Sequence, residues 1–233
     1  MIISIHQPEH MPWLGFFYKM KHSELFVILD SVQYRKNYFQ NRNQIVTNGK
    51  PNYITVTVPT PGHISSTIDQ MKLGQNDWRT GYLNKIKESY RKHPYFNIHF
   101  PEIEKIILED FEYLEDLNME LINYFRDFLG IETPLVYSKD LGIDTHKDNL
   151  VFDICKKLGA DTYISGVFGR EYLNLDQFKE SNIKVVYNEY TKYEYSQYKL
   201  NDFIPYMSLL DIAMNHDSEE ANNILESSFV LAE

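Results

Sequence analysis

Residues 1–30 read MIISIHQPEHMPWLGFFYKMKHSELFVILD, and this stretch decides the predicted fold. The apolar run Ile2–Ile5 indicates a buried strand. The aromatic and apolar side chains of Trp13–Met20 recur at helical spacing, with Pro12 in the first turn. The apolar run Phe26–Leu29 indicates a second strand. A strand, a helix and a strand in this order form the βαβ unit of a parallel sheet.

The rest of the chain continues the alternation of strands and helices. Further strands are predicted over 53–58, 135–137, 162–165 and 184–187. Further helices are predicted over 77–92, 101–128, 149–158, 176–180, 206–215 and 218–228, and residues 145–148 resemble a capping box for the helix at 149–158. We therefore expect a single α/β domain over residues 1–233. It has a mainly parallel sheet, helices on both faces and a helical insertion around 77–130.

Composition limits the class of protein. A chain of 233 residues is long enough to bury a core without disulfides or a structural metal. The lone Cys155 excludes a disulfide framework and any cysteine-based metal or iron–sulfur site. No apolar run approaches the roughly 20 residues of a membrane span. The N-terminus also lacks the basic and long apolar segments of a signal peptide. We expect a cytoplasmic protein without a membrane partner.

Charge is distributed unevenly along the chain. The formal net charge of −10 argues against bulk binding of nucleic acid or anionic membranes, which needs a basic face. Residues 31–68 nevertheless form a basic segment, because they contain four Lys or Arg and no Asp or Glu. This basic segment predicts a pocket for a small anion, and the alternative is an ordinary basic loop. By contrast, the nine acidic residues of 101–128 are expected on a solvated face.

The first polar segment, residues 6–13 (HQPEHMPW), follows the first predicted strand. Ligands of parallel sheets bind beyond the carboxyl ends of the strands. Backbone N–H groups at the start of a helix hold phosphate, and imidazoles carry protons near neutral pH. We therefore expect His6 and His10 to be catalytic and Gln7 and Trp13 to contact substrate. The alternative is that one histidine caps a helix or packs in the loop.

The second polar segment, residues 30–42, follows the second predicted strand and should reach the same edge of the sheet. Guanidinium groups bind phosphate oxygens in pairs, and aromatic rings stack on bases or line sugar pockets. The residues of this segment expected to bind substrate are Gln33, Tyr34, Arg35, Lys36, Tyr38, Asn41 and Arg42. The alternative is a polar connection with no ligand.

The third polar segment follows the strand predicted at 162–165, where Ser165-Gly166 precedes Gly169-Arg170. We expect Arg170 and the backbone of Ser165 and Gly166 to stabilise an oxyanion, although glycine turns after strands are common. A fourth segment ends at His216, which is explained more simply as a partner of a helix dipole. The sequence contains no GxGxxG, Walker, GxSxG or HExxH motif, so a metal site has no support.

Several of these segments together resemble one protein family. Residues 5–17 (IHQPEHMPWLGFF), 30–34 (DSVQY), 40–43 (QNRN), 163–166 (YISG) and 208–211 (SLLD) with Asn215 are similar to the WbqC-like family, found among bacterial genes for surface polysaccharides. The resemblance covers nearly the whole chain. It departs at His10, where an aromatic residue is expected, and at His216, where Gly is usual.

The resemblance implies amide formation on a nucleotide-linked 4-amino sugar, because O-antigen clusters of this kind make polymers with N-acylated amino sugars, some of them glycylated. The leading hypothesis is an acyl- or aminoacyl-transferase of O-antigen or lipopolysaccharide biosynthesis. His6 or His10 acts as its general base. The nucleotide sugar is a substrate and not a resident cofactor. The acyl donor stays open among a CoA thioester, an aminoacyl-tRNA and a free acid activated by ATP.

Two other hypotheses remain. The predicted strand, histidine loop and helix also resemble the layout of nucleotidylyl-transferases, a group that includes pantothenate synthetase. That likeness implies an adenylate-forming ligase or nucleotidyltransferase with ATP and Mg²⁺ at residues 6–13, although the second histidine of the HxGH signature is missing. The 34 residues of Phe, Trp and Tyr would also suit a non-catalytic sugar- or nucleotide-binding module.

Overall fold

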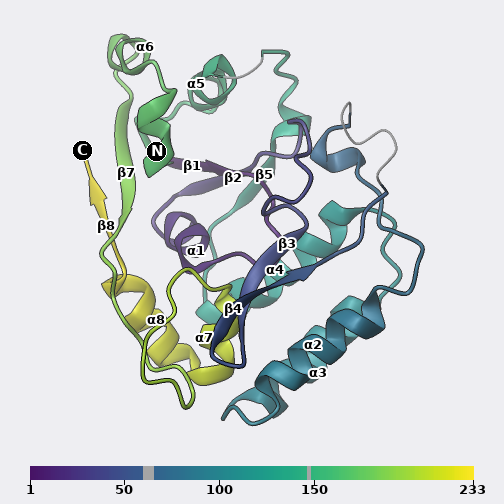
Figure 1. Cartoon of the computed structure of the whole chain (residues 1–233). Helices are drawn as coiled ribbons and strands as arrows, with labels where there is room; N and C mark the ends of the chain where they lie inside the picture. Colours follow the sequence, from purple (N-terminus) through teal and green to yellow (C-terminus); the bar gives the residue numbers. More distant parts are fainter. Residues whose placement is uncertain (60–65, 146–147) are drawn as a thin grey trace.

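The predicted βαβ unit is present in the computed structural model, which describes residues 1–59, 66–145 and 148–233 (Figure 1). Strand β1 (Ile2–His6), helix α1 (Leu14–Lys21) and strand β2 (Leu25–Ile28) follow one another. β1 and β2 are parallel, and His6 at the end of β1 is paired with Ile28.

A six-stranded sheet forms the centre of the molecule, in the order β5-β2-β1-β6-β7-β8. Its remaining strands are β5 (Leu135–Tyr137), β6 (Thr162–Gly166), β7 (Lys184–Tyr190) and β8 (Phe229–Ala232). The pairs among the first five strands of this order are parallel, and only β7 and β8 are antiparallel. The fold class is therefore α/β with a mainly parallel sheet, as predicted.

Helices cover both faces of this sheet. On one face, α5 (Asp148–Lys157) and α6 (Leu175–Glu180) share an apolar cluster with Ile3, Ile5 and Val27. On the other face, α1 packs with α4 (Leu114–Leu129) and α8 (Ser218–Ser227), as in the edge contact between the rings of Phe17 and Phe125.

A second layer lies outside α1 and α4. It contains the hairpin of β3 (Arg42–Thr47) and β4 (Lys50–Thr55) with helices α2 (Arg79–Tyr90), α3 (Phe96–Leu108) and α7 (Leu209–Asn215). Three 3₁₀ turns complete the described structure: η1 (Ile68–Gln70), η2 (Ser138–Leu141) and η3 (Val167–Glu171). Side chains of α2, α3 and α4 join the same core cluster as those of α1. The single-domain organisation stays a prediction.

Some helices begin or end at residues that the sequence marks as caps. Gly130 ends α4 with a φ of 62°, and the Ser208 hydroxyl accepts a hydrogen bond from the Leu210 N–H at the start of α7. Strands β3 and β8 were not predicted, because β3 begins with polar residues and β8 has only four residues. The capping box expected at 145–148 includes residues 146–147, which lie outside the described residues. In the part of the chain that the structure describes, no helix is long and apolar enough to cross a membrane.

Candidate functional site

The direction in which successive strands are added to the sheet reverses between β1 and β6. From β1 the chain builds outward through β2 to β5, and β6 then returns to the other side of β1 to begin β7 and β8. Such a switch point leaves a crevice beyond the carboxyl ends of the two central strands, where open α/β sheets bind ligands. Because Ser4 is paired with Ile164, the ends of these strands, His6 and Gly166, lie beside one another.

His6 lies at this edge of the sheet and is partly exposed. Its side chain is 24% exposed, and its ring packs edge-on against Phe16 on the α1 face of the sheet. Nδ1 lies 3.1 Å from the Gln7 carbonyl oxygen, which can only accept, so Nδ1 carries the proton and Nε2 has the lone pair. Burial, and then the charge of Lys19, lower the pKa of His6 to about 3. The ring is therefore neutral, with its lone pair at Nε2, and it is a weaker base than a free imidazole.

Two buried groups lie behind His6. Glu9 Oε1 is 3.7 Å from His6 Nε2, while Glu9 Oε2 is buried without a hydrogen-bond partner among the described residues. The Lys19 ammonium donates to the Ile5 carbonyl at 3.2 Å. Burial raises the pKa of Glu9 to about 8 and lowers that of Lys19 to about 7, and each charge partly offsets the effect on the other. An unsatisfied buried carboxylate oxygen beside an imidazole is a frequent feature of functional sites.

The two glycines after β6 differ in their surroundings. A Cβ added at Gly166 would meet no heavy atom within 4 Å, so the space beside the end of β6 is open. A Cβ at Gly169 would collide with Ser165 Oγ, because η3 lies directly on the fully buried Ser165. The Ser165 hydroxyl donates to the Gly166 carbonyl at 3.0 Å. Of the predicted pair, Gly166 therefore faces the crevice, and the Ser165 side chain does not.

Arg170 is directed away from His6. Its Nη2 lies 2.6 Å from Glu189 Oε1, and its guanidinium is 4.1 Å from the centre of the Tyr187 ring. Tyr187 and Glu189 are two and four residues after Val185 on β7, so they lie on the same face as Val185, which packs in the cluster on the α5 and α6 face. His6 packs on the α1 face, so the two side chains lie on opposite faces of the sheet. This placement argues against the expected role of Arg170 as an oxyanion partner of His6.

His10 is fully buried, and both of its ring nitrogens are occupied. Asn118 donates through Nδ2 to the carbonyls of Pro8 and Gln40, so its Oδ1 accepts the Nδ1 proton of His10 at 2.9 Å. The Tyr82 hydroxyl then donates to Nε2 at 2.6 Å. Burial lowers the pKa of His10 to about 4, against a smaller rise from Asn118. Because no nitrogen is left for substrate, this placement argues against the expected role of His10 as a base.

Residues 8–12 are all buried, so the first polar segment is mainly an internal loop. Asn43 Nδ2 donates to the carbonyls of His10 and Met11 at 3.3 and 2.9 Å, and Gln40 Nε2 donates to Gln7 Oε1 at 2.5 Å. Gln7 is half-buried at the crevice end of this loop. The expected phosphate-binding loop thus carries its hydrogen bonds internally.

The Trp13 ring packs in an aromatic cluster and not in the crevice. Its centre lies 6.0 Å from that of Tyr190 and 5.4 Å from that of Phe229, at the β7 and β8 end of the sheet. Gly15 allows this position, because any Cβ there would collide with the indole. The structure therefore gives Trp13 a packing role, and its expected contact with substrate stays a prediction.

The second polar segment is divided between the surface and the interior. Gln33, Arg35, Lys36 and Tyr38 are exposed, and Arg42 is half-buried. The guanidinium of Arg35 lies 5.2 Å from the Tyr38 ring, and that of Arg42 lies 4.3 Å from the Tyr53 ring. The two other predicted residues, Tyr34 and Asn41, are 2% and 3% exposed, so neither ring nor amide can lie against a ligand in solvent.

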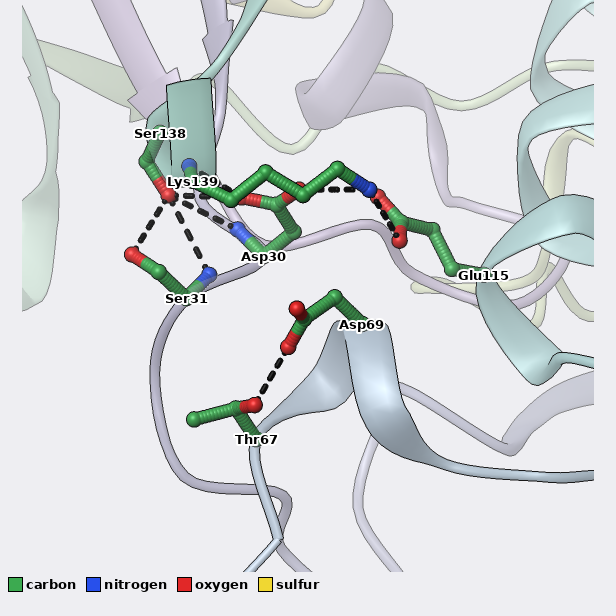
Figure 2. Close-up of polar contacts among 7 residues, drawn as sticks. All are labelled: Asp30, Ser31, Thr67, Asp69, Glu115, Ser138 and Lys139. Atoms are coloured by element: carbon green, nitrogen blue, oxygen red, sulfur yellow. Dashed lines mark hydrogen bonds and ion pairs between the residues drawn. The ribbon is translucent and has the colours of Figure 1, made fainter. Parts of the chain in front are cut away.

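A polar cluster lies one strand further along the same edge, and it joins the start of the second polar segment to residues that sequence reasoning missed (Figure 2). Asp30 Oδ1 accepts from the Ser138 hydroxyl at 2.7 Å and from the Lys139 N–H at 3.0 Å. The Ser31 hydroxyl lies 2.8 Å from that of Ser138. These contacts join the carboxyl ends of β2 and β5. Ser138 and Lys139 follow a correctly predicted strand, so the rule applied to the other strand ends would have found them.

The Lys139 ammonium bridges two buried carboxylates in this cluster, at 3.2 Å from Asp30 Oδ2 and 2.8 Å from Glu115 Oε2. Burial lowers the pKa of Lys139, but the two carboxylates raise it more, so the ammonium stays charged. Burial raises the pKa of Glu115 to about 7, against the effect of Lys139. Glu115 was expected on a solvated face and is instead 4% exposed, because α4 packs in the core.

Comparison with known proteins yields one family. The model of the WbqC-like protein family matches residues 7–223. The uncharacterized protein Rv1507c of Mycobacterium tuberculosis is 29% identical over 218 residues, which cover 93% of this chain and 94% of that protein. Within the ranges 1–59, 66–145 and 148–233, no group of three or more His, Cys, Asp or Glu side chains is arranged to hold a metal ion.

Proposed function

The chain belongs to the WbqC-like protein family, and from that membership we propose that it transfers an acyl or aminoacyl group to the amine of a nucleotide-linked amino sugar. The product is an amide, such as the glycyl amide of a 4-amino sugar used for O-antigen. The observation that carries the reaction class is His6. It is a neutral, half-buried imidazole at the switch point, its unprotonated Nε2 lies 3.7 Å from Glu9, and the neighbouring strand end at Gly166 has open space beside it.

Amide formation needs a base at such a place. The sugar nitrogen attacks the acyl carbon, the bond from that carbon to the leaving group breaks, and the nitrogen loses a proton. His6 Nε2 accepts this proton when the nitrogen has become cationic and therefore acidic. Glu9 lies 3.7 Å away, and its carboxyl, whose pKa burial raises to about 8, favours the imidazolium that forms in those molecules in which it is ionised. The proton then leaves with the thiolate, hydroxyl or phosphate of the donor.

The basic part of residues 31–42 supplies the phosphate contacts in this proposal. Arg35, Lys36 and Arg42 carry three positive charges in a segment without acids, and none forms an ion pair in the described part of the chain. Arg42 follows Gln40, which is hydrogen-bonded to Gln7 beside His6. A diphosphate near Arg42 would place the attached sugar toward the crevice. The exposed Tyr38 ring is then available to stack on the base.

A product assay tests the proposal. Uridine- and thymidine-diphosphate 4-amino sugars are incubated with each donor class in turn: acyl-CoA, aminoacyl-tRNA, or ATP with free acid. The products are analysed by mass spectrometry. We expect an amide of the nucleotide sugar with one donor class, and its loss in His6→Gln. Tight binding of the sugar nucleotide without any product would indicate a binding module instead, and acid-dependent exchange of pyrophosphate into ATP would indicate an adenylate-forming ligase.

A further inference from the structure

A second cavity lies at the end of the β3–β4 hairpin remote from Arg42. Its walls are the turn after β3, the residues that end and follow α2, and the segment 197–200, and the buried Asp211 of α7 lies at its base. Its volume is about 360 Å³, which is within the range of small-molecule sites, roughly 300–1,000 Å³. β3 runs from Arg42 to Thr47, so the cavity lies about 17 Å from Arg42 at the usual rise of a strand.

Hydrogen bonds to one carboxylate hold the walls of this cavity together. Asp211 Oδ1 accepts from the Tyr90 hydroxyl at 2.9 Å, and Oδ2 accepts from the Tyr195 hydroxyl at 3.0 Å and from Gln197 Nε2 at 2.9 Å. The Tyr90 hydroxyl also accepts from the Val46 N–H of β3 at 3.1 Å. α2, β3, α7 and the segment before α7 are thereby fixed to one another. A cavity with walls fixed in advance loses less entropy when it binds a ligand.

The charges around the cavity favour an anion. Arg91, Lys92 and Lys199 line it, against the single exposed carboxylate of Glu88. In the described ranges of the chain none of these three cations forms an ion pair. Three neutral donors stabilise the Asp211 carboxylate without removing its charge, so the lining has three cations against the two carboxylates of Glu88 and Asp211. Three unpaired cations at one cavity of a protein with a net charge of −10 create a local positive potential.

Aromatic rings form part of the wall beside these cations. The His93 ring lies 4.8 Å, centre to centre, from the rings of both Tyr90 and Tyr198. Burial lowers the pKa of His93, so its ring is neutral and adds no charge. The Lys199 ammonium lies 5.0 Å from the centre of the Tyr198 ring, so cations and aromatic rings adjoin one another in this wall, an arrangement that suits a flat ligand with one charged end.

We propose that this cavity binds a small organic anion, an aromatic or heteroaromatic ring that bears a phosphate or a carboxylate. The site is separate from the crevice at His6 and does not depend on the transferase activity. Its base includes Asp211 of the SLLD segment that the proposed reaction does not use.

Isothermal titration with phenyl phosphate, benzoate and the neutral analogue phenol tests the site. We expect the wild type to bind at least one of the anions, and to bind phenol at least tenfold more weakly. The double variant Arg91→Gln/Lys199→Gln should lose at least tenfold in anion affinity, because charged hydrogen bonds contribute most of the binding. Lys87→Gln, which removes an exposed cation one turn earlier on α2, and Arg42→Gln should leave the affinity unchanged.

The NMR signals of the His93 imidazole, assigned with His93→Gln, localise the ligand, and we expect them to shift during the titration. Lys199→Gln alone is measured as well, so that a folding defect of the double variant does not decide the result. The proposal is overturned if the wild type binds neither anion at millimolar concentration. It is also overturned if the folded variants bind as well as the wild type, or if Arg42→Gln abolishes the binding.

Discussion

The two ends of the segment 6–10 carry the same side chain in opposite situations. His6 lies at the end of β1 with 24% of its side chain exposed, Nδ1 is held by a backbone carbonyl, and Nε2 makes no hydrogen bond to the described residues. His10, four residues later, is fully buried between Asn118 and Tyr82, which use both of its nitrogens. A histidine acts as a base only where one nitrogen is both unprotonated and accessible. Only His6 meets this condition, and the other histidine holds the loop in place.

The largest expected effect is on turnover at His6. His6→Gln should lower kcat by about 10²–10⁴, the usual contribution of a general base, because glutamine cannot take the proton. The thermal stability should stay near that of the wild type, since the ring is partly exposed. His22→Gln is the control, because His22 is a similarly exposed histidine just after α1. A His6→Gln variant with full turnover would contradict the comparison.

The second prediction concerns the stability that His10 provides. His10→Ala leaves Asn118 Oδ1 and the Tyr82 hydroxyl buried without partners and opens a cavity. The free energy of unfolding should fall by roughly 2–5 kcal/mol. Urea denaturation measures this loss, and the turnover of the remaining folded protein should stay close to that of the wild type. A stable variant without activity would reverse the roles of the two histidines.

The third prediction uses the buried carboxyl group beside His6. The pKa of Glu9 is about 8 in the folded protein, against 4.5 ordinarily, so between these pH values the unfolded chain loses a proton that the folded protein keeps. This group therefore makes stability fall as pH rises from 4.5 to 8, by up to about 1.4 kcal/mol per pH unit.

Glu9→Gln removes that dependence. Relative to the wild type, its free energy of unfolding should increase steadily between pH 5 and pH 8. Urea denaturation at each pH gives the difference, and Glu120→Gln, an exposed substitution on α4, is the control. A constant difference across this range would show that Glu9 titrates normally.

The smallest expected effect separates the two glycines after β6. Gly166→Val should raise the KM for the nucleotide sugar about tenfold, because the new side chain enters open space and meets only the ligand. Its free energy of unfolding should change little. Gly169→Ala should lower the free energy of unfolding and leave the KM nearly unchanged, because its methyl group collides with Ser165 Oγ. Steady-state kinetics and thermal denaturation of both variants decide the matter, and an unchanged KM in Gly166→Val would place the substrate elsewhere.

Sequence reasoning located the edge of the sheet correctly, and the structure argues against several of the side-chain roles expected there. Periodicity predicted strands that end at Ile5, Tyr137 and Ser165, within one residue of the ends in the structure, because burial along a strand is a local property. The burial and hydrogen bonding of the His10 ring depend on Asn118 and Tyr82, which are 108 and 72 residues away along the chain. No local pattern contains such partners.

Two other side chains illustrate the same limit. Arg170 forms an ion pair with Glu189 of β7. Because successive side chains of a strand point to opposite faces, this pair lies on the face of the sheet opposite His6. Trp13 folds over its own helix because residue 15 is glycine, a close approach that becomes evident only in three dimensions. The sequence shows which strand ends carry polar groups, and packing decides which of those groups reach a ligand.

The most direct test of the central claim, that His6 at the switch point is the base, is a crystal structure with a nucleotide-linked 4-amino sugar and no acyl donor. The account predicts the sugar amine within about 3.5 Å of His6 Nε2 and beside Gly166, with the diphosphate toward Arg42. An amine bound beside Arg170 and Glu189 on the other face, or a sugar nucleotide with no contact to His6, would contradict it.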